Sequence, residues 1–158
     1  TNDAPSAVMR LLELGVPHYL LEATLAGILA QRLVRVLCPY CKSDDGALTD
    51  DVWRSLAQDQ ALPKPQRVYR PVGCPECRQT GYRGRTGLYE LLAVTPAFSR
   101  LITASTETRL LRAQAMQDGM TPLRVAGARK VAEGLSTAEE VLKVTAALAA
   151  QDAQDAPA

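Results

Sequence analysis

Apolar residues recur at helical spacing along the first part of the chain. The first stripe predicts a helix over residues 4–14 that ends at Gly15, and its apolar members are Ala7, Val8, Leu11, Leu12 and Leu14. A second helix is expected to begin behind Pro17 and to run through residues 18–37, where the apolar positions form a broad face. A face of this width predicts that the second helix is largely buried.

The middle of the chain changes from acidic to basic. Residues 43–63 contain five Asp and one Arg, whereas residues 64–85 contain six Lys or Arg and one Glu. In the acidic part, Thr49 followed by two Asp is typical of a helix N-terminus and predicts a short helix. Alternating polarity at residues 67–72 and again at residues 86–94 predicts two short strands.

Helix start and stop signals occupy the remainder of the chain. The Thr-Pro pairs at residues 95–96 and 121–122 each place Pro at a first helical position behind a Thr cap. Ser136 and Glu139 have the spacing of a capping box and predict one more helix. The last eight residues, 151–158, are expected to form a frayed tail.

Composition limits the possible function classes. The chain has 158 residues, of which 47% are hydrophobic and 22% charged, so it is expected to form one domain of ordinary size, or a core piece plus a small module, with a real core. A net charge of +1 gives no overall attraction to nucleic acid or membranes. The longest uncharged apolar run, residues 23–30, is far shorter than the ~20 residues of a membrane-spanning helix, and no secretory signal is recognisable. We therefore expect a cytosolic location, where paired thiols more often bind metal than form disulfides.

All four cysteines of the chain fall into two C-x2-C pairs, and Pro follows the first Cys of each pair. The pairs are Cys38 with Cys41 and Cys74 with Cys77. A C-x2-C turn presents two thiolates on one side of a tight loop, at the spacing that tetrahedral Zn²⁺ requires. Two such pairs complete the coordination and leave no open position, so the sequence predicts a structural zinc site. The alternatives fit less well, because disulfides need an oxidising compartment, a redox C-x-x-C occurs singly, and unrelated thiols would rarely share two identical spacings.

Basic residues close to these cysteines have two interpretations. A zinc ion bound by four thiolates carries a net negative charge, which Arg35, Lys42, Arg78 and Arg83 are placed in the sequence to offset. The chain also has fourteen Arg against four Lys, and Arg is favoured in fixed ion pairs and against phosphates.

The second interpretation is a free-standing zinc ribbon that binds nucleic acid. The basic segment and Tyr69, Tyr82 and Tyr89 would then hold phosphates and stack on bases. We favour ion pairing between the basic segment and its acidic neighbour, because the two carry opposite charges and are adjacent in the sequence.

Three stretches, in this order, resemble the C-terminal end of the type II secretion and type IV pilus assembly ATPases. They are "TNDAPSAVMRLLELGVPHYLLEATLAGILAQRLVRVLCPYC", "YRPVGCPECRQTGYRGRTGLYELLAV" and "GMTPLRVAGARKVAEGLSTAEEVLKVT". The resemblance covers about residues 1–146. "AQRLVR" before the first cysteine pair and "GYRGRTGLYELL" after the second are specific to this family and favour its secretion branch.

The resemblance implies a hexameric P-loop motor that drives pseudopilus or pilus assembly at the bacterial inner membrane. It also implies that the P-loop, the acidic nucleotide-binding motifs and the His box precede Thr1, together with the ATP and Mg²⁺ that they bind. This chain has no G-x-x-x-x-G-K-[ST], because none of its four Lys follows a Gly. We therefore expect no catalytic and no cofactor-binding residue here, and no ATP hydrolysis by the chain alone.

The expected fold is mainly α with a small β-hairpin and a zinc-knuckle module, as the C-terminal part of a RecA-like α/β P-loop ATPase. The expected divisions are helices of the ATPase core (1–37), the tetracysteine zinc module (38–85), a C-terminal strand and helical subdomain (86–150), and the tail (151–158). The resemblance further implies a homo-hexamer, an inner-membrane platform protein and the cytoplasmic domain of a recruiting membrane protein as partners. It implies a location in the cytoplasm, peripheral to the inner membrane, and no nucleic acid partner.

Other residues carry narrower expectations. His18 is expected at a surface or helix start, since the four Cys already complete a metal site. Two interpretations are open for three polar residues of the second predicted helix, Gln31, Arg32 and Arg35. They form either a solvated, ion-paired helix face or the boundary with a neighbouring subunit and its nucleotide, and we favour the first.

Two further stretches are interpreted against the family pattern. Tyr82 to Arg85 are expected to form the turn of a β-hairpin that anchors the zinc module, with Gly84 and Gly87 supplying backbone freedom. The family tends to read like "LREDGLRKV" where this chain reads "LRVAGARKV", so Val125, Ala126 and Ala128 replace two acids and a larger apolar residue.

Overall fold

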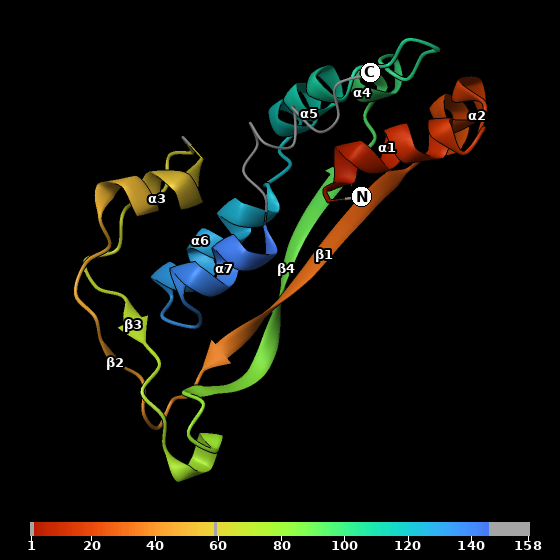
Figure 1. The fold of residues 1–158 in the computed structure, drawn as a ribbon. Helices are drawn as coiled ribbons and strands as arrows, with labels where there is room; N and C mark the ends of the chain where they lie inside the picture. Colours follow the sequence, from red (N-terminus) through yellow and green to blue (C-terminus); the bar gives the residue numbers. More distant parts are fainter. Residues whose placement is uncertain (1, 59, 146–158) are drawn as a thin grey trace. The chain divides into compact units, whose positions relative to one another are not determined.

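The structure, a computed structural model, describes residues 2–58 and 60–145. The expected frayed tail therefore lies outside the described residues. The helices are α1 (Ala4–Glu13), α2 (His18–Thr24), α3 (Asp50–Ala57), α4 (Pro96–Ser99), α5 (Thr108–Gln117), α6 (Leu123–Ala132) and α7 (Ala138–Val144), with a short 3-10 helix η1 (Pro75–Cys77). The strands are β1 (Gly27–Leu37), β2 (Ser43–Asp44), β3 (Tyr69–Arg70) and β4 (Tyr82–Ala93). Figure 1 shows their order along the chain.

The chain divides into two compact units. Among the described residues, unit 1 contains residues 2–30 and 89–122, and unit 2 contains residues 31–88, apart from residue 59, and 123–145. Unit 1 carries α1, α2, α4 and α5, whereas unit 2 carries α3, α6, α7 and all four cysteines.

The second predicted helix is wrong beyond residue 24. Residues 27–37 form the strand β1, which pairs with β4 in a two-stranded sheet. The N–H of Val94 donates to Ala26 O (3.0 Å), next to the start of β1 and the end of β4. The N–H of Cys38 donates to Gly81 O (2.9 Å), next to the opposite ends, so the two strands run antiparallel.

Burial along β1 explains why its sequence also fits the helix that was predicted for these residues. Exposure alternates along the strand, so that Leu29 (59%) and Leu33 (48%) are exposed whereas Val34 (1%) is buried. Apolar residues occupy both faces of this stretch, and such a run fits a helix and a strand almost equally well. Gly27 is the first residue of β1 and lies very close to the paired strand β4. A side chain at this position would place its Cβ 3.0 Å from Leu92 O.

The β-hairpin turn predicted at Tyr82 to Arg85 is also wrong. These residues are the first four of β4, whose partner is the distant β1. The expected strand at residues 67–72 is reduced to β3, which pairs antiparallel with β2 in the register Ser43 with Arg70 and Asp44 with Tyr69. Gly84 has a φ of +79°, a left-handed conformation within β4 that a side chain rarely adopts.

Unit 1 is built around an apolar core that α1, α4 and α5 share with β4. Its buried members are Ala4, Val8, Leu21, Leu92, Phe98, Ile102, Leu111, Ala115 and Met120. The helix α1 begins at Ala4, where the first stripe predicts it. Asp3 is its N-cap, because the Asp3 carboxylate accepts the N–H of Ser6 at 2.9 Å. The same carboxylate pairs with Arg112 of α5 at 2.7 Å, and both side chains are at most 5% exposed. A buried ion pair therefore joins the first turn of α1 to α5.

Unit 2 packs α3, α6 and α7 together. Thr49 caps α3 as predicted, accepting the N–H of Val52. The cap of α7 is Thr137, one residue after the predicted Ser136, because the Thr137 hydroxyl accepts the N–H of Glu140. The helices α6 and α7 approach closely at Gly127, where an added Cβ would lie 2.2 Å from Val141 Cγ1.

The departures from the family pattern lie on α6. Val125 (1% exposed) and Ala128 (0%) are fully buried, and Ala126 is half-buried. The buried positions therefore hold small or branched apolar residues that suit close helix packing.

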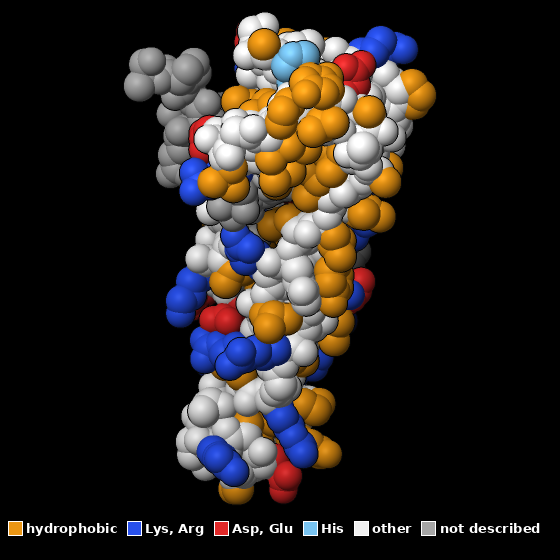
Figure 2. All heavy atoms as spheres, turned by 90° about the vertical axis from the view of Figure 1, so that its right-hand side faces the viewer, with side chains coloured by type: hydrophobic (Ala, Val, Ile, Leu, Met, Phe, Trp, Pro, Cys, Tyr) orange, Lys and Arg blue, Asp and Glu red, His pale blue; other side chains and the backbone are white. Residues whose placement is uncertain are grey.

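Some large apolar side chains remain exposed. Figure 2 shows hydrophobic side chains gathered beside the histidine of α2. The exposed ones on α1 and α2 and their junction include Leu14 (64%), Tyr19 (59%) and Leu20 (45%). Within the described residues, no helix has both the length and the apolar character needed to span a bilayer.

Candidate metal centre

The two cysteine pairs occupy two tight turns of unit 2. Cys38 directly follows β1, and the N–H of Cys41 returns to Cys38 O at 3.4 Å. In the second pair, Cys74 precedes η1 and Cys77 is its last residue. Pro75 occupies the first position of η1, where its fixed φ favours the turn. The local sequence thus folds each C-x2-C into a loop with both sulfurs on one side.

The four sulfur atoms lie within 4.8 Å of one another. The Sγ–Sγ distances are 3.8 Å for Cys38–Cys74, 3.8 Å for Cys41–Cys77 and 3.7 Å for Cys74–Cys77. Thiolates about 2.3 Å from a tetrahedral Zn²⁺ are separated by about 3.8 Å, whereas bonded sulfurs are about 2.05 Å apart. The cysteines are therefore free thiols at the spacing of a four-sulfur metal site, brought together as the sequence predicts.

Burial divides each pair into an inner and an outer sulfur. Cys38 (0% exposed) and Cys77 (6%) are buried, whereas Cys41 and Cys74 are half-buried. No other group of three or more potential metal-binding His, Cys, Asp or Glu side chains is found in the part of the chain that the structure describes. One sulfur of each pair is thus closed off from solvent, as in structural rather than catalytic sites.

Backbone amides, rather than basic side chains, donate to the sulfur atoms. Gly73 N–H donates to Cys41 Sγ at 3.3 Å, and the N–H groups of Cys74 and Gly81 each donate to Cys77 Sγ at 3.2 Å. In the metal-free thiols, burial raises the pKa of Cys74 to about 11. Burial also favours the neutral thiol of Cys77, but the amide hydrogen bonds from Cys74 and Gly81 outweigh it and lower its pKa to about 6. Amide dipoles therefore stabilise a thiolate at Cys77.

Gly73 and Gly81 are site residues that the sequence analysis did not single out. Their φ angles are +112° and +74°, and a Cβ at Gly81 would lie 2.4 Å from Pro71 Cβ. Only glycine fits such a conformation at such a close approach, and this conformation directs both amides toward the sulfurs. The signal was present in "GCPECRQTG", where a glycine stands directly before the second pair and another four residues after it.

Three of the four basic residues expected to offset the thiolate charge have other partners. Arg35 pairs with Glu140 at 2.6 Å and stacks 3.9 Å from the Tyr82 ring centroid. Hydrogen bonding to Glu140 raises the pKa of Arg35, and the same bond lowers the pKa of Glu140. Lys42 donates to Gly134 O at 2.7 Å.

Arg83 is the third of these basic residues that has other partners. Its guanidinium pairs with Glu76 at 3.8 Å and lies 5.6 Å from the Tyr40 ring centroid. Side-chain charge compensation by these residues therefore stays a prediction, whereas the amide hydrogen bonds are part of the structure.

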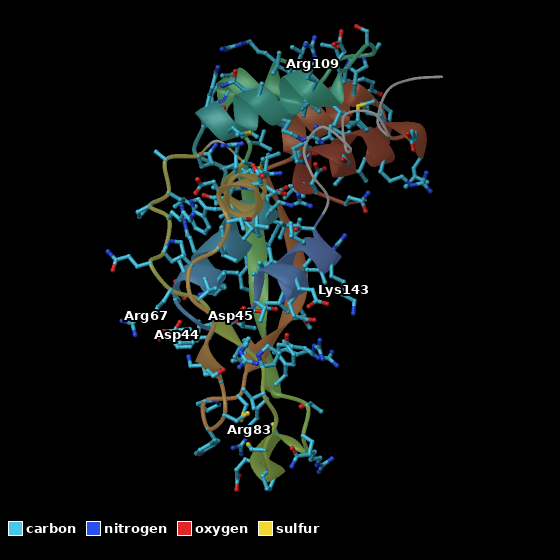
Figure 3. All side chains as sticks on the ribbon, turned by 60° about the vertical axis from the view of Figure 1, so that its left-hand side comes forward. Asp44, Asp45, Arg67, Arg83, Arg109 and Lys143 are labelled. Carbon is cyan, nitrogen blue, oxygen red and sulfur yellow. The ribbon has the colours of Figure 1, made fainter. Side chains whose placement is uncertain are left out.

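The acidic and basic segments pair with each other, as the sequence analysis favoured. Asp44 pairs with Arg67 at 3.7 Å and Asp45 with Arg70 at 3.6 Å, around the short β2–β3 pair. Figure 3 labels Asp44, Asp45 and Arg67. Lys64 pairs with Asp50 at the start of α3. These contacts occupy basic groups that the nucleic-acid hypothesis requires for phosphates.

Two of the tyrosines expected to stack on bases are already covered by cations. Arg35 lies over Tyr82, and Lys42 lies 4.6 Å from the Tyr69 ring centroid. Tyr89 on β4 is 52% exposed. The faces of Tyr69 and Tyr82 that a base would stack on are therefore each in contact with a cationic side chain of unit 2.

The remaining candidate residues lie outside the sulfur cluster. His18 is the first residue of α2, as expected, and makes an edge contact with the ring of Tyr19. Gln31, Arg32 and Arg35 lie on β1 rather than on a helix face. Arg35 is ion-paired, which agrees with the favoured of the two interpretations for that residue.

Comparison with known proteins identifies relatives over nearly the whole chain. Residues 1–143 match the family described as Type II/IV secretion system protein. The Type IV pilus assembly ATPase TfpB of Acinetobacter baylyi is 48% identical over 146 residues, covering 91% of this chain and 24% of that protein. The Type II secretion system protein HxcR of Pseudomonas aeruginosa is 41% identical over 145 residues, covering 92% and 27%.

A third relative has similar coverage. The Type II secretion system ATPase E of Vibrio cholerae is 43% identical over 149 residues, covering 92% of this chain and 28% of that protein. The chain thus spans about a quarter of the length of the curated relatives that it matches.

Proposed function

Because the chain belongs to the Type II/IV secretion system protein family, we propose that it is the C-terminal, zinc-stapled part of a cytoplasmic hexameric ATPase that powers type II protein secretion. The observation that carries this proposal is the family match over residues 1–143, together with relatives whose names describe a type II secretion ATPase. The hexamer, pseudopilus assembly and the position at the cytoplasmic side of the inner membrane are parts of the proposal.

Pilus assembly is the second candidate function. It is favoured by the 48% identity to a type IV pilus assembly ATPase over 146 residues. Deletion of the gene in its own organism, with pilus-dependent motility and exoprotein release measured in parallel, separates the two. Loss of exoprotein release alone supports the secretion branch, and loss of motility alone replaces it with the pilus branch.

The metal site is proposed to hold one structural Zn²⁺, with Cys38, Cys41, Cys74 and Cys77 as ligands. The support is the sulfur spacing of 3.7–3.8 Å, which matches a tetrahedron of thiolates. When bound, the ion supplies a fixed cross-link between the loop after β1 and the loop before β4, with no open position for substrate. The chain's own part is to hold the sulfurs, exclude water from Cys38 and direct amides toward Cys77.

Metal content tests this site directly. Elemental analysis of the purified chain is expected to give one zinc per chain, and the Cys38→Ser variant is expected to lose it. A Ser43→Ala variant in the neighbouring β2 leaves all four thiols intact and serves as the matched control. A folded chain without zinc, with four thiols that react in solution, would overturn the proposal.

ATP hydrolysis is assigned to sequence outside these residues. Phosphoryl transfer requires a phosphate-binding loop, a held Mg²⁺ and a positioned water, and none of the four Lys stands in a P-loop motif. The RecA-like core and its ATP and Mg²⁺ are proposed to lie upstream, and the chain alone is expected to release no phosphate from ATP. Steady phosphate release that survives removal of contaminating ATPases would contradict this assignment.

The division of the chain into ATPase-core helices (1–37), zinc module (38–85), C-terminal subdomain (86–150) and tail (151–158) is likewise proposed. Its partners are proposed to be an inner-membrane platform protein and the cytoplasmic domain of a recruiting membrane protein. Exposed apolar side chains on paired β1 and β4 in unit 1, including Leu29 (59%) and Leu91 (62%), support packing against further protein. Loss of co-purification of the full-length ATPase with the platform protein in the Leu29→Ser and Leu91→Ser variants would locate that contact.

A further inference from the structure

The turn between α6 and α7 is attached to the backbone on which the cysteines stand. This turn, residues 134–137, is called the α6–α7 turn below. The N–H of Leu37, the residue before Cys38, donates to Leu135 O at 2.8 Å. The Ser136 hydroxyl donates to Arg35 O, also at 2.8 Å. The end of β1 therefore forms two hydrogen bonds to the turn immediately before the first ligand.

The first cysteine pair adds a contact from its far side. Lys42 directly follows Cys41, and its ammonium group donates to Gly134 O at 2.7 Å. The same ammonium lies 4.6 Å from the centroid of the Tyr69 ring. Gly134 approaches this ring so closely that an added Cβ would lie 2.8 Å from Tyr69 Cε2. Lys42 thus bridges the first ligand loop, the aromatic ring and the turn.

The second cysteine pair reaches the turn through Gly81 and Tyr82. Gly81 donates its N–H to Cys77 Sγ at 3.2 Å and accepts the N–H of Cys38 at 2.9 Å. The next residue, Tyr82, shares a hydrogen bond of 3.2 Å between its hydroxyl and Thr137 Oγ1. The position of one ligand and the position of the turn are therefore fixed by two consecutive residues.

We propose that the sulfur cluster and the α6–α7 turn are coupled, with Lys42 and Tyr82 as the positioning residues that link them. Metal binding fixes the two ligand loops, and these loops hold the turn in place through Lys42 and Tyr82. The inference rests on the proposed metal site and adds a second element that responds to its occupancy. Release of the metal is expected to free the α6–α7 turn and the first turn of α7.

Coupling of this kind is reciprocal. If metal binding favours the ordered turn, the ordered turn must favour metal binding by the same factor. Residues that orient ligands from outside the coordination sphere commonly change metal affinity by about 10–100-fold. Removing one of the two bridging contacts is therefore expected to weaken zinc binding about tenfold, although neither Lys42 nor Tyr82 is a ligand.

Zinc affinity tests the coupling from one direction. Competition with a chromophoric chelator gives the Kd of the wild-type chain and of the Lys42→Met and Tyr82→Phe variants. Both variants are expected to bind zinc about tenfold more weakly. Lys130→Met is the matched control, because it removes an ammonium on α6 that pairs with exposed Glu133. Lys42→Arg retains a cationic donor and is expected to recover most of the affinity.

Hydrogen exchange tests the coupling from the other direction. Peptides that cover residues 133–144 are expected to exchange faster after chelation of the wild-type chain, and faster in zinc-loaded Tyr82→Phe than in zinc-loaded wild type. Equal affinities within about twofold and unchanged exchange, in chains that bind one zinc, would overturn the coupling. A wild-type chain that binds no zinc would instead overturn the proposed metal site, so the two failures are distinct.

Discussion

Asp3 combines two interactions at the first turn of α1. One carboxylate oxygen caps the helix through the N–H of Ser6, and the other pairs with Arg112 inside unit 1. Removing one partner of a buried ion pair commonly costs about 3–5 kcal/mol, because the remaining charge stays buried. Asn retains the ability to cap a helix, so Asp3→Asn separates the ion pair from the cap.

We expect Asp3→Asn to lower the free energy of unfolding of unit 1 by about 3 kcal/mol, at the low end of that range. Urea denaturation followed by hydrogen exchange of α1 and α5 peptides measures it. Glu13→Gln breaks an exposed pair with Arg10 in the same helix, whose side chains are each 60% exposed, and is expected to cost under about 0.5 kcal/mol. Equal costs for the two variants would show that burial of the Asp3 pair is unimportant.

Glu140 of α7 forms an ion pair with Arg35 of β1 within unit 2. Its side chain is 7% exposed and its pKa is lowered by the hydrogen bond from Arg35. A carboxyl group with a lowered folded pKa contributes stability above its unfolded pKa of about 4.3, and this contribution is lost as pH falls through the lower folded value. Because Arg35 is 48% exposed, solvent screening limits the contribution to about 1–2 kcal/mol.

The Glu140→Gln variant is therefore expected to be about 1–2 kcal/mol less stable than wild type, by the same amount at pH 8 and at pH 5.5, since both lie above the unfolded pKa of about 4.3. Urea unfolding of the zinc-loaded proteins at the two pH values measures the difference. Glu133→Gln, which breaks the exposed pair with Lys130, is the matched control. A difference that already shrinks between pH 8 and pH 5.5 would mean that the pKa of Glu140 is raised.

Among the elements, α6 and α7 show how a single glycine sets the distance between two helices. Ala is about 1 kcal/mol more favourable than Gly inside a helix when space allows. At Gly127, however, the added Cβ would lie 2.2 Å from Val141 Cγ1, and overpacking commonly costs about 1–3 kcal/mol. The sign of the effect of Gly127→Ala therefore reports the packing directly.

We expect Gly127→Ala to destabilise unit 2 by about 1–3 kcal/mol, through overpacking. In a Val141→Ala background, which removes the two Cγ atoms, the same change is expected to be neutral or stabilising. Urea unfolding of the four proteins of this cycle gives the interaction energy between the two positions. Additive effects would show that α6 and α7 do not meet at this pair.

The elements also show which features the sequence determines locally. The sulfur cluster was predictable because each C-x2-C pair places two sulfurs on one side of a tight turn, whatever the fold between the pairs. The helix α3 was predictable from the cap signal at Thr49, and α1 from its apolar stripe, since both signals are local in the sequence. The strand β1 was not predictable in this way. Its pairing partner β4 begins 45 residues after β1 ends, so no local feature of the apolar run distinguishes a strand from a helix. The amides of Gly73 and Gly81 were missed because their positive φ angles depend on how the loop of the second cysteine pair folds back on itself, where Gly73 approaches Gln79 and Gly81 approaches Pro71.

At the scale of the whole molecule, the two units differ in what stabilises them. Unit 1 has an apolar core and the buried pair of Asp3 and Arg112, and it contains none of the cysteines. Unit 2 contains all four cysteines and also Trp53, the single Trp of the chain, which is 8% exposed on α3. Tryptophan fluorescence therefore reports on unit 2 alone, while exchange of α1 and α5 peptides reports on unit 1.

Removal of zinc is expected to lower the stability of unit 2 selectively. Free zinc at a hundredfold excess over its Kd stabilises the folded unit by about 2.7 kcal/mol, and each kcal/mol corresponds to about 4–8 °C in a unit of this size. Chelation is therefore expected to lower the thermal midpoint of Trp53 fluorescence by roughly 10 °C or more, while exchange of α1 and α5 peptides changes little. The zinc-free Cys38→Ser variant controls for direct effects of the chelator, since its midpoint should not respond. A common shift of both probes would show that the two units unfold together and that the metal stabilises the whole chain rather than the unit that holds its ligands.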